Sequence, residues 1–507
     1  MHSVIQAVGL VLDPQVLLTV VLASLFGLFV GAVPGLTATM ATALLVPITF
    51  FMDPLSAVAA IVACTAMAIT AGDIPGCLLR IPGTPASAAY TDETFAMTKR
   101  GLGAQALGSS LVSSVIGGIV GTVVLILAAP ALARIALQFS SFEYFWLALI
   151  GLSCAAFVSS DDPLRGFVSL LIGLFIASVG MDSVSGTPRF TLGVVELLGG
   201  ISFIPAMIGM FAVSEILNSL VRGTARERFA ATQKVTGIFR GILGLVRRYW
   251  RNVARGSVTG TLIGVLPGAG GDIAAWISYA TAKRFSKTPE KFGTGHPEGV
   301  IEAGAANNGG LSGAWVPALV FGIPGDAVTA IAVGVLFMKG LNPGPRLFEA
   351  QAEMLYAVFI IFLIANLLLL PFGWAAIRLA SRILTVPRPQ LMAIILLFCV
   401  VGSFAINNTV FDIGLMLGFG ILAFLLSLAG FPVAPIILGI VLGPLLEQNF
   451  LTSMVIAGGD IAGFFERPIA AALGVAAILI WAVPLGLAGL RLLRGGTRTA
   501  KPAENNS

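Results

Sequence analysis

Charged residues are scarce in this chain: 10% of its 507 residues are Asp, Glu, Lys or Arg, whereas 57% are hydrophobic. Charged residues make up about a quarter of a soluble globular domain, so the composition excludes that class. Apolar stretches recur at residues 16–33, 102–131, 168–180, 355–370 and 470–490. Runs of about 17–25 apolar residues span a bilayer as helices. The sequence therefore predicts an all-α polytopic membrane protein.

Histidine and cysteine are equally scarce, and this limits the chemistry available. The two histidines are His2 and His296, and the four cysteines have no spacing typical of a metal site. The sequence also lacks a P-loop and a Ser-His-Asp set. We expect no catalytic residues, no enzyme activity, no cofactor and no resident metal beyond a transported Na⁺.

The few basic residues are concentrated in two places. One group lies between apolar blocks and the other follows the last apolar block; their members are Arg222, Arg226, Arg228, Lys234, Arg240, Arg247, Arg248, Arg251 and Arg255, then Arg491, Arg494, Arg498 and Lys501. Basic loops of membrane proteins stay in the cytoplasm. Aromatic residues do not alternate with these charges, which argues against nucleic-acid binding. We expect a cytoplasmic C-terminus and a lipid bilayer, not a nucleic acid, as the partner of this charge.

The central basic stretch has the pattern of an amphipathic helix. Ile238, Ile242, Leu245 and Tyr249 recur at helical spacing in "GIFRGILGLVRRYWRNVARG". Such a helix would lie on the inner face of the membrane; a surface for docking a partner protein is the alternative. The first 15 residues contain no Lys or Arg, unlike the basic start of a signal peptide. We therefore expect the N-terminus to be retained and to face the outside.

Two parts of the sequence repeat the same motifs. "GLFVGAVPGL" at 27–36 matches "GTLIGVLPGA" at 260–269, with an offset of 233 residues. "DIPGCLLRIPGTPASA" at 73–88 matches "WVPALVFGIPGDAVTA" at 315–330, with an offset of 242. We interpret this order as a duplication.

The predicted organisation has five parts. They are a first transmembrane repeat at 14–218, a basic cytoplasmic linker with an amphipathic helix at 219–246, a second transmembrane repeat at 247–448, an extra C-terminal transmembrane region at 449–491 and a disordered cytoplasmic tail at 492–507. The basic linker and the C-terminus are both placed inside, and one extra helix precedes the C-terminus, so the second repeat must cross the membrane an odd number of times. A first repeat with the same number of crossings starts outside, in agreement with the uncharged N-terminus. Two such repeats have inverted topology, as in many secondary transporters.

Gly- and Pro-rich segments interrupt the apolar runs in corresponding positions of the two repeats. They lie at 33–42, 73–93, 266–276 and 307–330. Interrupted helices survive in a membrane only where protein or a polar cavity covers the exposed backbone. Corresponding interruptions in two halves are the best sequence indication of a transporter's binding site. Close helix packing by small residues is the structural alternative. Each segment allows either one broken helix or a hairpin.

Two sets of candidate site residues follow from these segments. Helix starts offer free N–H groups, and nearby hydroxyls and amides can bind a carboxylate; the expected substrate contacts are Pro34, Gly35, Thr37, Thr39, Arg80, Pro82, Gly83, Thr84, Ser87, Asn307, Asn308, Pro324, Gly325 and Thr329. Carboxylates and exposed carbonyls can bind Na⁺ or carry a proton; the expected cation contacts are Asp73, Gly268, Gly270, Asp272 and Asp326. N-capping is the alternative for the aspartates. Arg80 could instead hold a helix C-terminus or reach the membrane surface.

The segments "GLFVGAVPGLTATMATALLVPITF", "AGDIPGCLLRIPGTPASAAYTDE", "GTLIGVLPGAGGDIAAWISY" and "FGIPGDAVTAI" resemble the large membrane subunit of the bacterial tripartite tricarboxylate transporters. The resemblance extends over about residues 14–490. It implies a cation-coupled importer of di- or tricarboxylates in the inner membrane, with Na⁺ favoured over H⁺. It also implies two partners, a small membrane subunit and a periplasmic solute-binding protein, and alternating access that could be of the elevator type. An uncoupled channel-like or receptor-type membrane module is the alternative function.

Overall fold

The computed structural model consists almost entirely of helices. It describes residues 2–158, 162–182, 186–221, 237–384 and 388–493. The basic residues at 222–236, the tail from 494 and most of the predicted linker lie outside the described residues. Among the described residues, strands are limited to one antiparallel pair, β1 (Gly180–Met181) and β2 (Pro188–Arg189).

The N-terminal part of the chain contains long helices separated by short ones. They are α1 (His2–Val11), α2 (Pro14–Ala32), α3 (Ala38–Thr49), α4 (Pro54–Ala71), α5 (Asp73–Leu79), α6 (Pro85–Ala88), α7 (Thr91–Lys99), α8 (Gly103–Ala136), α9 (Ser141–Val158), α10 (Pro163–Ala177), η1 (Val195–Leu197), α11 (Phe203–Ile208), the π-helix η2 (Gly209–Val213) and α12 (Ser214–Val221).

The C-terminal part has a similar alternation of lengths. Its elements are α13 (Ile242–Arg248), α14 (Trp250–Gly264), α15 (Gly270–Phe285), η3 (Pro289–Lys291), α16 (Pro297–Phe321), α17 (Ala327–Met338), α18 (Leu347–Ala350), α19 (Ala352–Ile383), α20 (Arg388–Asn407), α21 (Val410–Leu428), α22 (Ala434–Ile456), η4 (Ile461–Phe465) and α23 (Pro468–Leu493).

Eight of the described helices are long and apolar enough to cross a membrane. They include α2, α8 and α19, and a run from Pro54 to Leu79 that joins α4 and α5. The prediction of an all-α polytopic membrane protein is confirmed. The number of full crossings and the division into repeats stay predictions, because length and composition alone do not give topology.

Asp-Pro pairs in the sequence start three of these helices. Asp13, Asp53 and Asp162 each accept a hydrogen bond from a backbone N–H in the first turn of α2, α4 and α10. Proline follows each of them at the first helical position, where its missing N–H would have no partner within the helix. Asp162 is thus the N-cap of α10.

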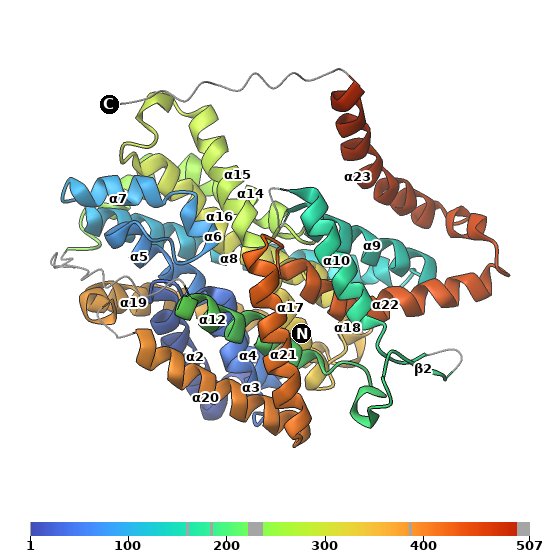
Figure 1. The fold of residues 1–507 in the computed structure, drawn as a ribbon. Coiled ribbons are helices and arrows are strands. Elements are labelled where there is room, and N and C mark those ends of the chain that lie inside the picture. Colours follow the sequence, from blue (N-terminus) through green and yellow to red (C-terminus); the bar gives the residue numbers. More distant parts are fainter. Residues whose placement is uncertain (1, 159–161, 183–185, 222–236, 385–387, 494–507) are drawn as a thin grey trace, which may run out of the picture.

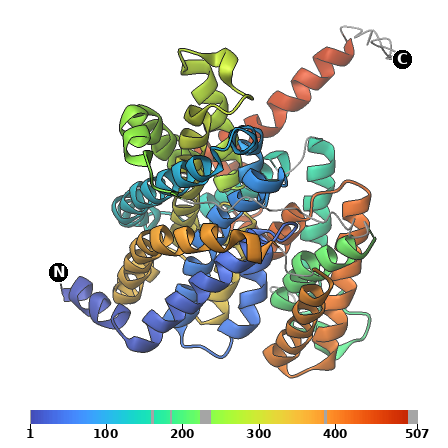
Figure 2. The same ribbon diagram turned by 90° about the vertical axis from the view of Figure 1, so that its left-hand side faces the viewer.

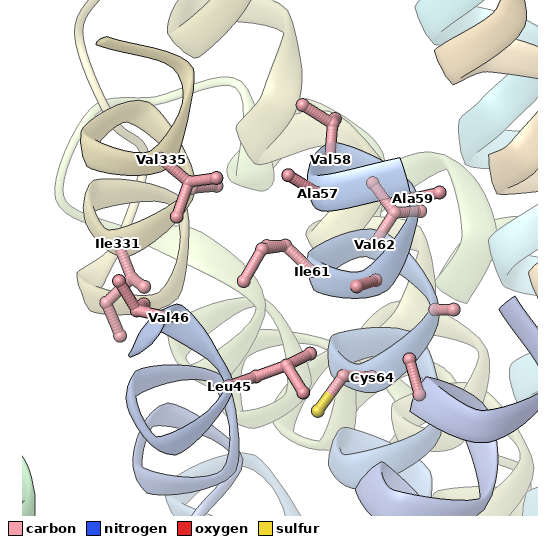
Figure 3. Packing of buried hydrophobic residues seen from close by; sticks show 14 of the residues in the cluster. Leu45, Val46, Ala57, Val58, Ala59, Ile61, Val62, Cys64, Ile331 and Val335 are labelled. Atoms are coloured by element: carbon pink, nitrogen blue, oxygen red, sulfur yellow. The ribbon is translucent and has the colours of Figure 1, made fainter. Parts of the chain in front are cut away.

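The largest hydrophobic core of the described residues includes the place where α3, α4 and α17 meet. Leu45 and Val46 from α3 face Ile61 and Val62 from α4, and Ile331 and Val335 from α17 close the cluster (Figure 3). Lys339, directly after α17, donates hydrogen bonds to the carbonyl oxygens of Phe50 (2.7 Å) and Met52 (2.6 Å). Burial lowers the pKa of the Lys339 amine, because desolvation disfavours its charged form. This core therefore joins the N-terminal and C-terminal parts of the chain.

Glycines let pairs of helices approach until backbone meets backbone. A β-carbon placed on Gly27 of α2 would lie 2.2 Å from the carbonyl oxygen of Cys64 in α4. At the matching position of the second repeat, a β-carbon on Gly260 of α14 would lie 2.5 Å from the carbonyl oxygen of Ala306 in α16. Gly31 and Gly264 make the same kind of contact with Ala68 and Gly310. Small residues at such positions are typical of packed membrane helices.

A second group of helices lies beside these pairs. Helices α9, α10 and α22 pack on one another and lie on the right of Figure 1. Gly173 of α10 packs against the backbone of Ile436 in α22, where an added β-carbon would lie 2.2 Å from the carbonyl oxygen. Figure 2 shows α1 and α23 on opposite sides of the molecule.

Replacing Gly260 by leucine tests the close packing of α14 on α16. The side chain would have to displace the backbone of Ala306, and overpacking of this kind costs about 1–3 kcal/mol. We expect a lower melting temperature for purified Gly260→Leu, measured by thermal unfolding in detergent. Gly414→Leu is the matched control in α21, since a β-carbon there would have no heavy-atom neighbour within 4 Å among the described residues. Equal melting temperatures of the two variants would contradict this account of the packing.

A candidate site at four matched helix breaks

Four of the interruptions between the described helices coincide with the Gly- and Pro-rich segments, two in each predicted repeat. The interruptions lie at 33–37, between α2 and α3; at 80–84, between α5 and α6; at 265–269, between α14 and α15; and at 322–326, between α16 and α17. All four fall inside the Gly- and Pro-rich segments of the sequence. The sequence pattern therefore predicted the presence of the breaks correctly.

Two of the predicted breaks are shorter than the motifs suggested. Residues 73–79 form α5, and residues 307–321 belong to the continuous helix α16, with Pro317 inside it. The assignment of Asn307 and Asn308 to a break was wrong. The glycines that follow them serve packing: a β-carbon on Gly310 would lie 2.7 Å from the Cα of Gly271 in α15.

The first breaks of the two repeats have the same backbone conformation. Gly35 and Gly268 both have positive φ, at 85° and 82°. The N–H of Leu36 donates to the carbonyl of Val33 at 3.1 Å, and the N–H of Ala269 donates to that of Leu266 at 3.1 Å. Glycine adopts this left-handed conformation without steric cost, which explains the Pro-Gly pair in both segments.

The second breaks of the two predicted repeats also share a backbone conformation, although one of the matching residues differs in type. The N–H of Ile81 donates to the carbonyl of Pro75 at 3.3 Å, and that of Ile323 donates to the carbonyl of Pro317 at 3.3 Å. The preceding residue is left-handed in both, but it is Arg80 (φ 60°) in the first repeat and Gly322 (φ 70°) in the second. A left-handed non-glycine residue costs of order 1–3 kcal/mol.

Both second breaks end in a capping box. Thr84 accepts a hydrogen bond from the N–H of Ser87 at the start of α6, and Asp326 accepts one from the N–H of Thr329 at the start of α17. The hydroxyl oxygens of Ser87 and Thr329 accept hydrogen bonds from the N–H groups of Thr84 and Asp326 in return. The alternative role of N-capping therefore holds for Asp326. Asp73 and Asp272 lie within the first turns of α5 and α15 instead.

The structure brings breaks of the two predicted repeats into direct contact. Asp272 Oδ1 of α15 accepts a hydrogen bond from the N–H of Ala86 in α6 at 3.1 Å. The indole Nε1 of Trp276 donates to the carbonyl oxygen of Pro85 at 3.1 Å. A β-carbon on Gly270 would lie 2.5 Å from the β-carbon of Asp326, so the third and fourth breaks also touch. Trp276 was not among the predicted contact residues.

Several hydroxyl groups among the predicted substrate contacts already form hydrogen bonds with nearby backbone. Ser87 Oγ donates to the carbonyl of Thr84 at 2.9 Å, and Thr329 Oγ1 donates to the carbonyl of Asp326 at 3.0 Å. Thr37 and Thr84 accept hydrogen bonds from backbone N–H groups as helix caps. A hydroxyl that accepts keeps its own hydrogen for another acceptor, so Thr37 and Thr84 are the better donors to a ligand.

Arg80 lies beside an acid that its sequence neighbourhood did not reveal. Its Nε donates to Asp92 Oδ1 in α7 at 2.8 Å, and 61% and 67% of the two side chains are exposed. Exposed ion pairs contribute about 0–1 kcal/mol, so the pair can open at little cost. Two other residues of this break differ in burial. Pro82 is exposed, whereas Gly83 is buried and packs on Gly72.

A buried polar network lies beside the breaks. Asp73 Oδ1 accepts a hydrogen bond from the hydroxyl of Tyr90 at 2.7 Å, and Oδ2 accepts one from the hydroxyl of Ser110. Asn307 Nδ2 of α16 donates to the Tyr90 oxygen at 3.3 Å. Sequence reasoning missed Tyr90 and Ser110, because neither belongs to a motif that the two repeats share.

Asn308 belongs to a second buried network. Its Oδ1 accepts a hydrogen bond from Thr70 Oγ1 of α4 at 3.1 Å. Its Nδ2 donates to Asn366 Oδ1 of α19 at 3.5 Å. Asn308 thus has buried protein partners on two sides, and Thr70 and Asn366 are further residues that the sequence did not indicate.

Comparison with known proteins gives the same family over most of the chain. The model of the tripartite tricarboxylate transporter TctA family matches residues 17–438. A relative in Agrobacterium vitis, "Uncharacterized 52.8 kDa protein in TAR-I ttuC' 3'region", is 35% identical over 463 residues, which are 91% of this chain and 92% of the relative. Another, "Uncharacterized protein in TAR-II ttuC' 3'region", is 37% identical over 228 residues, 44% of this chain and 94% of the relative. No solved structure gives a significant match.

The capping role of Thr84 can be tested by substitution. Thr84→Val removes the oxygen that accepts from Ser87, and the loss of such a cap costs about 0.5–2 kcal/mol. We expect a lower melting temperature for purified Thr84→Val and a value close to wild type for Thr84→Ser, which keeps the hydroxyl. Equal melting temperatures for Thr84→Val and wild type would show that the capping box contributes nothing to stability.

Proposed function

Because the chain belongs to the tripartite tricarboxylate transporter TctA family, we propose that it is the permease of an importer that takes up an organic di- or tricarboxylate with the help of a solute-binding protein. The uptake is driven by a cation gradient, with Na⁺ as the coupling ion. Its partners are a small membrane subunit and a periplasmic binding protein. It resides in the bacterial inner membrane, with the N-terminus in the periplasm and the C-terminus in the cytoplasm.

The contacts among the second, third and fourth breaks are the observation that carries this proposal. Exposed backbone at membrane depth occurs in proteins where it is covered by protein or lines a cavity, and transporters use it to bind substrate. The contacts Asp272–Ala86 and Trp276–Pro85 bring an acid and an indole from the second repeat to a break of the first. Close helix packing alone does not require polar contacts of this kind between the two repeats.

The breaks offer groups that suit a carboxylate substrate. The free N–H groups at the start of α3 and α15 carry the positive end of a helix dipole. Thr37 and Thr84 have hydroxyl hydrogens to donate, and Arg80 supplies a cation. Thr37, Thr84, Arg80 and α3 belong to the first predicted repeat, and α15 belongs to the second, so a substrate bound among them would contact both.

The proposed mechanism is alternating access, and the position of these contacts supports it. The hydrogen bonds that Asp272 and Trp276 make with α6 join the two repeats at the breaks, and they must open if the repeats move relative to one another. Movement of one group of helices past another would be an elevator-type mechanism. The helix groups of Figure 1 are compatible with such a division.

Uptake by the reconstituted system tests the function. The full chain, its small subunit and its binding protein would be placed in liposomes, and entry of radiolabelled citrate and related acids would be measured. We expect uptake that needs the binding protein and an inward Na⁺ gradient. Liposomes with equal Na⁺ on both sides are the control. Uptake at the same rate without any cation gradient would overturn the coupling, and would favour the uncoupled channel-like module.

Substitution of Arg80 separates a role in substrate binding from a role in stability. Arg80→Gly reproduces the residue found at the matching position, Gly322, and relieves the left-handed strain. We expect an unchanged or higher melting temperature together with at least about a tenfold higher KM, since a charged hydrogen bond of 1.5–3 kcal/mol is lost. Arg80→Lys should lie between the two. Wild-type uptake kinetics in Arg80→Gly would remove Arg80 from the substrate site.

A further inference from the structure

The basic segment before α14 packs against the protein with the side that the sequence pattern assigned to the membrane. Ile238 and Ile242 are each 2% exposed. A β-carbon on Gly108 of α8 would lie 2.3 Å from the carbonyl oxygen of Ile238, and the side chain of Ile242 lies against the same glycine. These two isoleucines therefore anchor the segment on α8, and another side of it is exposed.

Exposed apolar side chains follow one line along α13 and α14. Leu243 is 82% exposed and Trp250 is 58% exposed, and Val258 and Leu262 of α14 are exposed by 51% and 61%. Only Tyr249 separates the two helices. The intervals along the line are about two, two and one helical turns. Exposed apolar side chains that form a continuous patch mark a contact with a membrane or a partner.

This line lies on the side of α14 that faces away from the protein. The glycines of α14 that pack on α16 are Gly256, Gly260 and Gly264. Residues two positions apart point to nearly opposite sides of a helix, so Val258 and Leu262 point away from α16. In a membrane protein the side chains on this side contact the hydrocarbon of the bilayer. The line thus continues the lipid-facing side of α14 onto α13.

Four exposed arginines accompany the line. Arg251 lies over the ring of Trp250 and Arg248 over that of Tyr249, each with 5.6 Å between the guanidinium carbon and the ring centroid. Arg255 in the next turn pairs with the buried Glu302. Within the part of the chain that the structure describes, no ion pair involves the four exposed arginines, which are Arg240, Arg247, Arg248 and Arg251. Their charge therefore has no counterion among the described residues.

The length of α14 places these arginines at the depth of the lipid headgroups. The helix has 15 residues and is about 22 Å long. It ends at the break at 265–269, and transporters bind substrate at such breaks near the bilayer midplane. The hydrocarbon extends about 15 Å to either side of the midplane. The start of α14, with Trp250 and Arg251, then lies among the headgroups, where tryptophan and arginine side chains are favoured.

We propose that this exposed face binds an anionic phospholipid. We call it the α13–α14 face, and its members are Arg240, Leu243, Arg247, Trp250, Arg251, Val258 and Leu262. Arg247 and Arg251 are one helical turn apart, and their guanidinium groups donate hydrogen bonds to the phosphate oxygens. The acyl chains lie along Val258 and Leu262.

The continuity of the face favours a lipid over a protein as its occupant. Its basic part lies among the headgroups and its apolar part in the hydrocarbon, which is the order of a phospholipid from head to tail. Basic residues beside an amphipathic helix bind anionic lipids in this way. The assignment to the cytoplasmic leaflet rests on the proposed function, because it uses the orientation given there. The binding itself depends on neither the substrate nor the coupling ion.

Competition between two lipids tests the α13–α14 face. The purified full chain would be titrated in detergent with phosphatidylglycerol and with phosphatidylcholine of the same acyl chains, and bound lipid would be counted by native mass spectrometry. We expect tighter binding of phosphatidylglycerol, and a smaller preference at high NaCl because salt screens the contact. The preference should fall more than tenfold in Arg247→Gln/Arg251→Gln, since each basic residue near an anionic lipid contributes about a fivefold change.

Single substitutions supply the matched control. Arg251→Gln and Arg346→Gln remove the same charge from exposed positions, but Arg346 precedes α18 and does not belong to the face. We expect a weaker lipid preference in Arg251→Gln and the wild-type preference in Arg346→Gln. Because the replaced side chains are exposed, melting temperatures in phosphatidylcholine nanodiscs should equal that of the wild type. Phosphatidylglycerol should raise the melting temperature of the wild type more than that of the double variant.

Three results would overturn the proposal. They are equal affinity of the wild type for the two lipids, an unchanged preference in the double variant, and displacement of the lipid by inorganic phosphate, which has no acyl chains. Loss of the small membrane subunit from the double variant with its lipid preference intact would assign the face to a protein and would also overturn it. The expected lipid preference in a protein that imports no carboxylate would remove the proposed function and leave the lipid face in place.

Discussion

The need to pair every backbone N–H and C=O group inside the protein is the constraint on which this structure depends. In a bilayer no water is available at an interrupted helix, and each unpaired group costs several kcal/mol. The chain meets the constraint at its breaks with side-chain caps: Thr37 at the start of α3, Thr84 at α6 and Asp326 at α17. The start of α15 has no side-chain cap of its own. Asp326, from another break, lies against Gly270 at this point. The breaks thus stabilise one another.

Close glycine contacts decide where these breaks lie in space. Gly31 and Gly264 hold α2 against α4 and α14 against α16, so the chain enters each first break from a fixed position. The same two residues then meet the second break of their repeat, because a β-carbon on Gly83 would lie 3.1 Å from the carbonyl oxygen of Gly31, and one on Gly325 would lie 3.1 Å from that of Gly264. A larger side chain at either position would separate the helices and move both breaks of that repeat. Packing and the candidate site are therefore not independent.

Sequence reasoning succeeded where the backbone itself sets the requirement. A Pro-Gly pair in an apolar run has few conformations available, so the positive φ of Gly35 and Gly268 could be expected from the motif. It failed at Asn307-Asn308-Gly309-Gly310, which looked like a break but lies within α16. A glycine in the sequence can either interrupt a helix or allow a neighbouring helix to approach closely. Only the position of α15 in the structure distinguishes these two roles. The partner of Arg80 was likewise hidden, since Asp92 lies 12 residues away on another helix.

The amino-acid sequence by itself determined that the chain is an all-α membrane protein, which segments interrupt its helices, and that these segments come in matched pairs. These properties depend on hydropathy, on proline and glycine, and on order along the chain, all of which are local. Only the tertiary structure decided which of the polar residues act together. Asp73 meets Tyr90, Ser110 and, through Tyr90, Asn307 because three helices cross at that point, and Asp272 meets Ala86 because the two repeats pack at their breaks. A contact such as that of Tyr90 with Asn307, 217 positions apart, depends on helix packing, for which a single sequence carries no local signal.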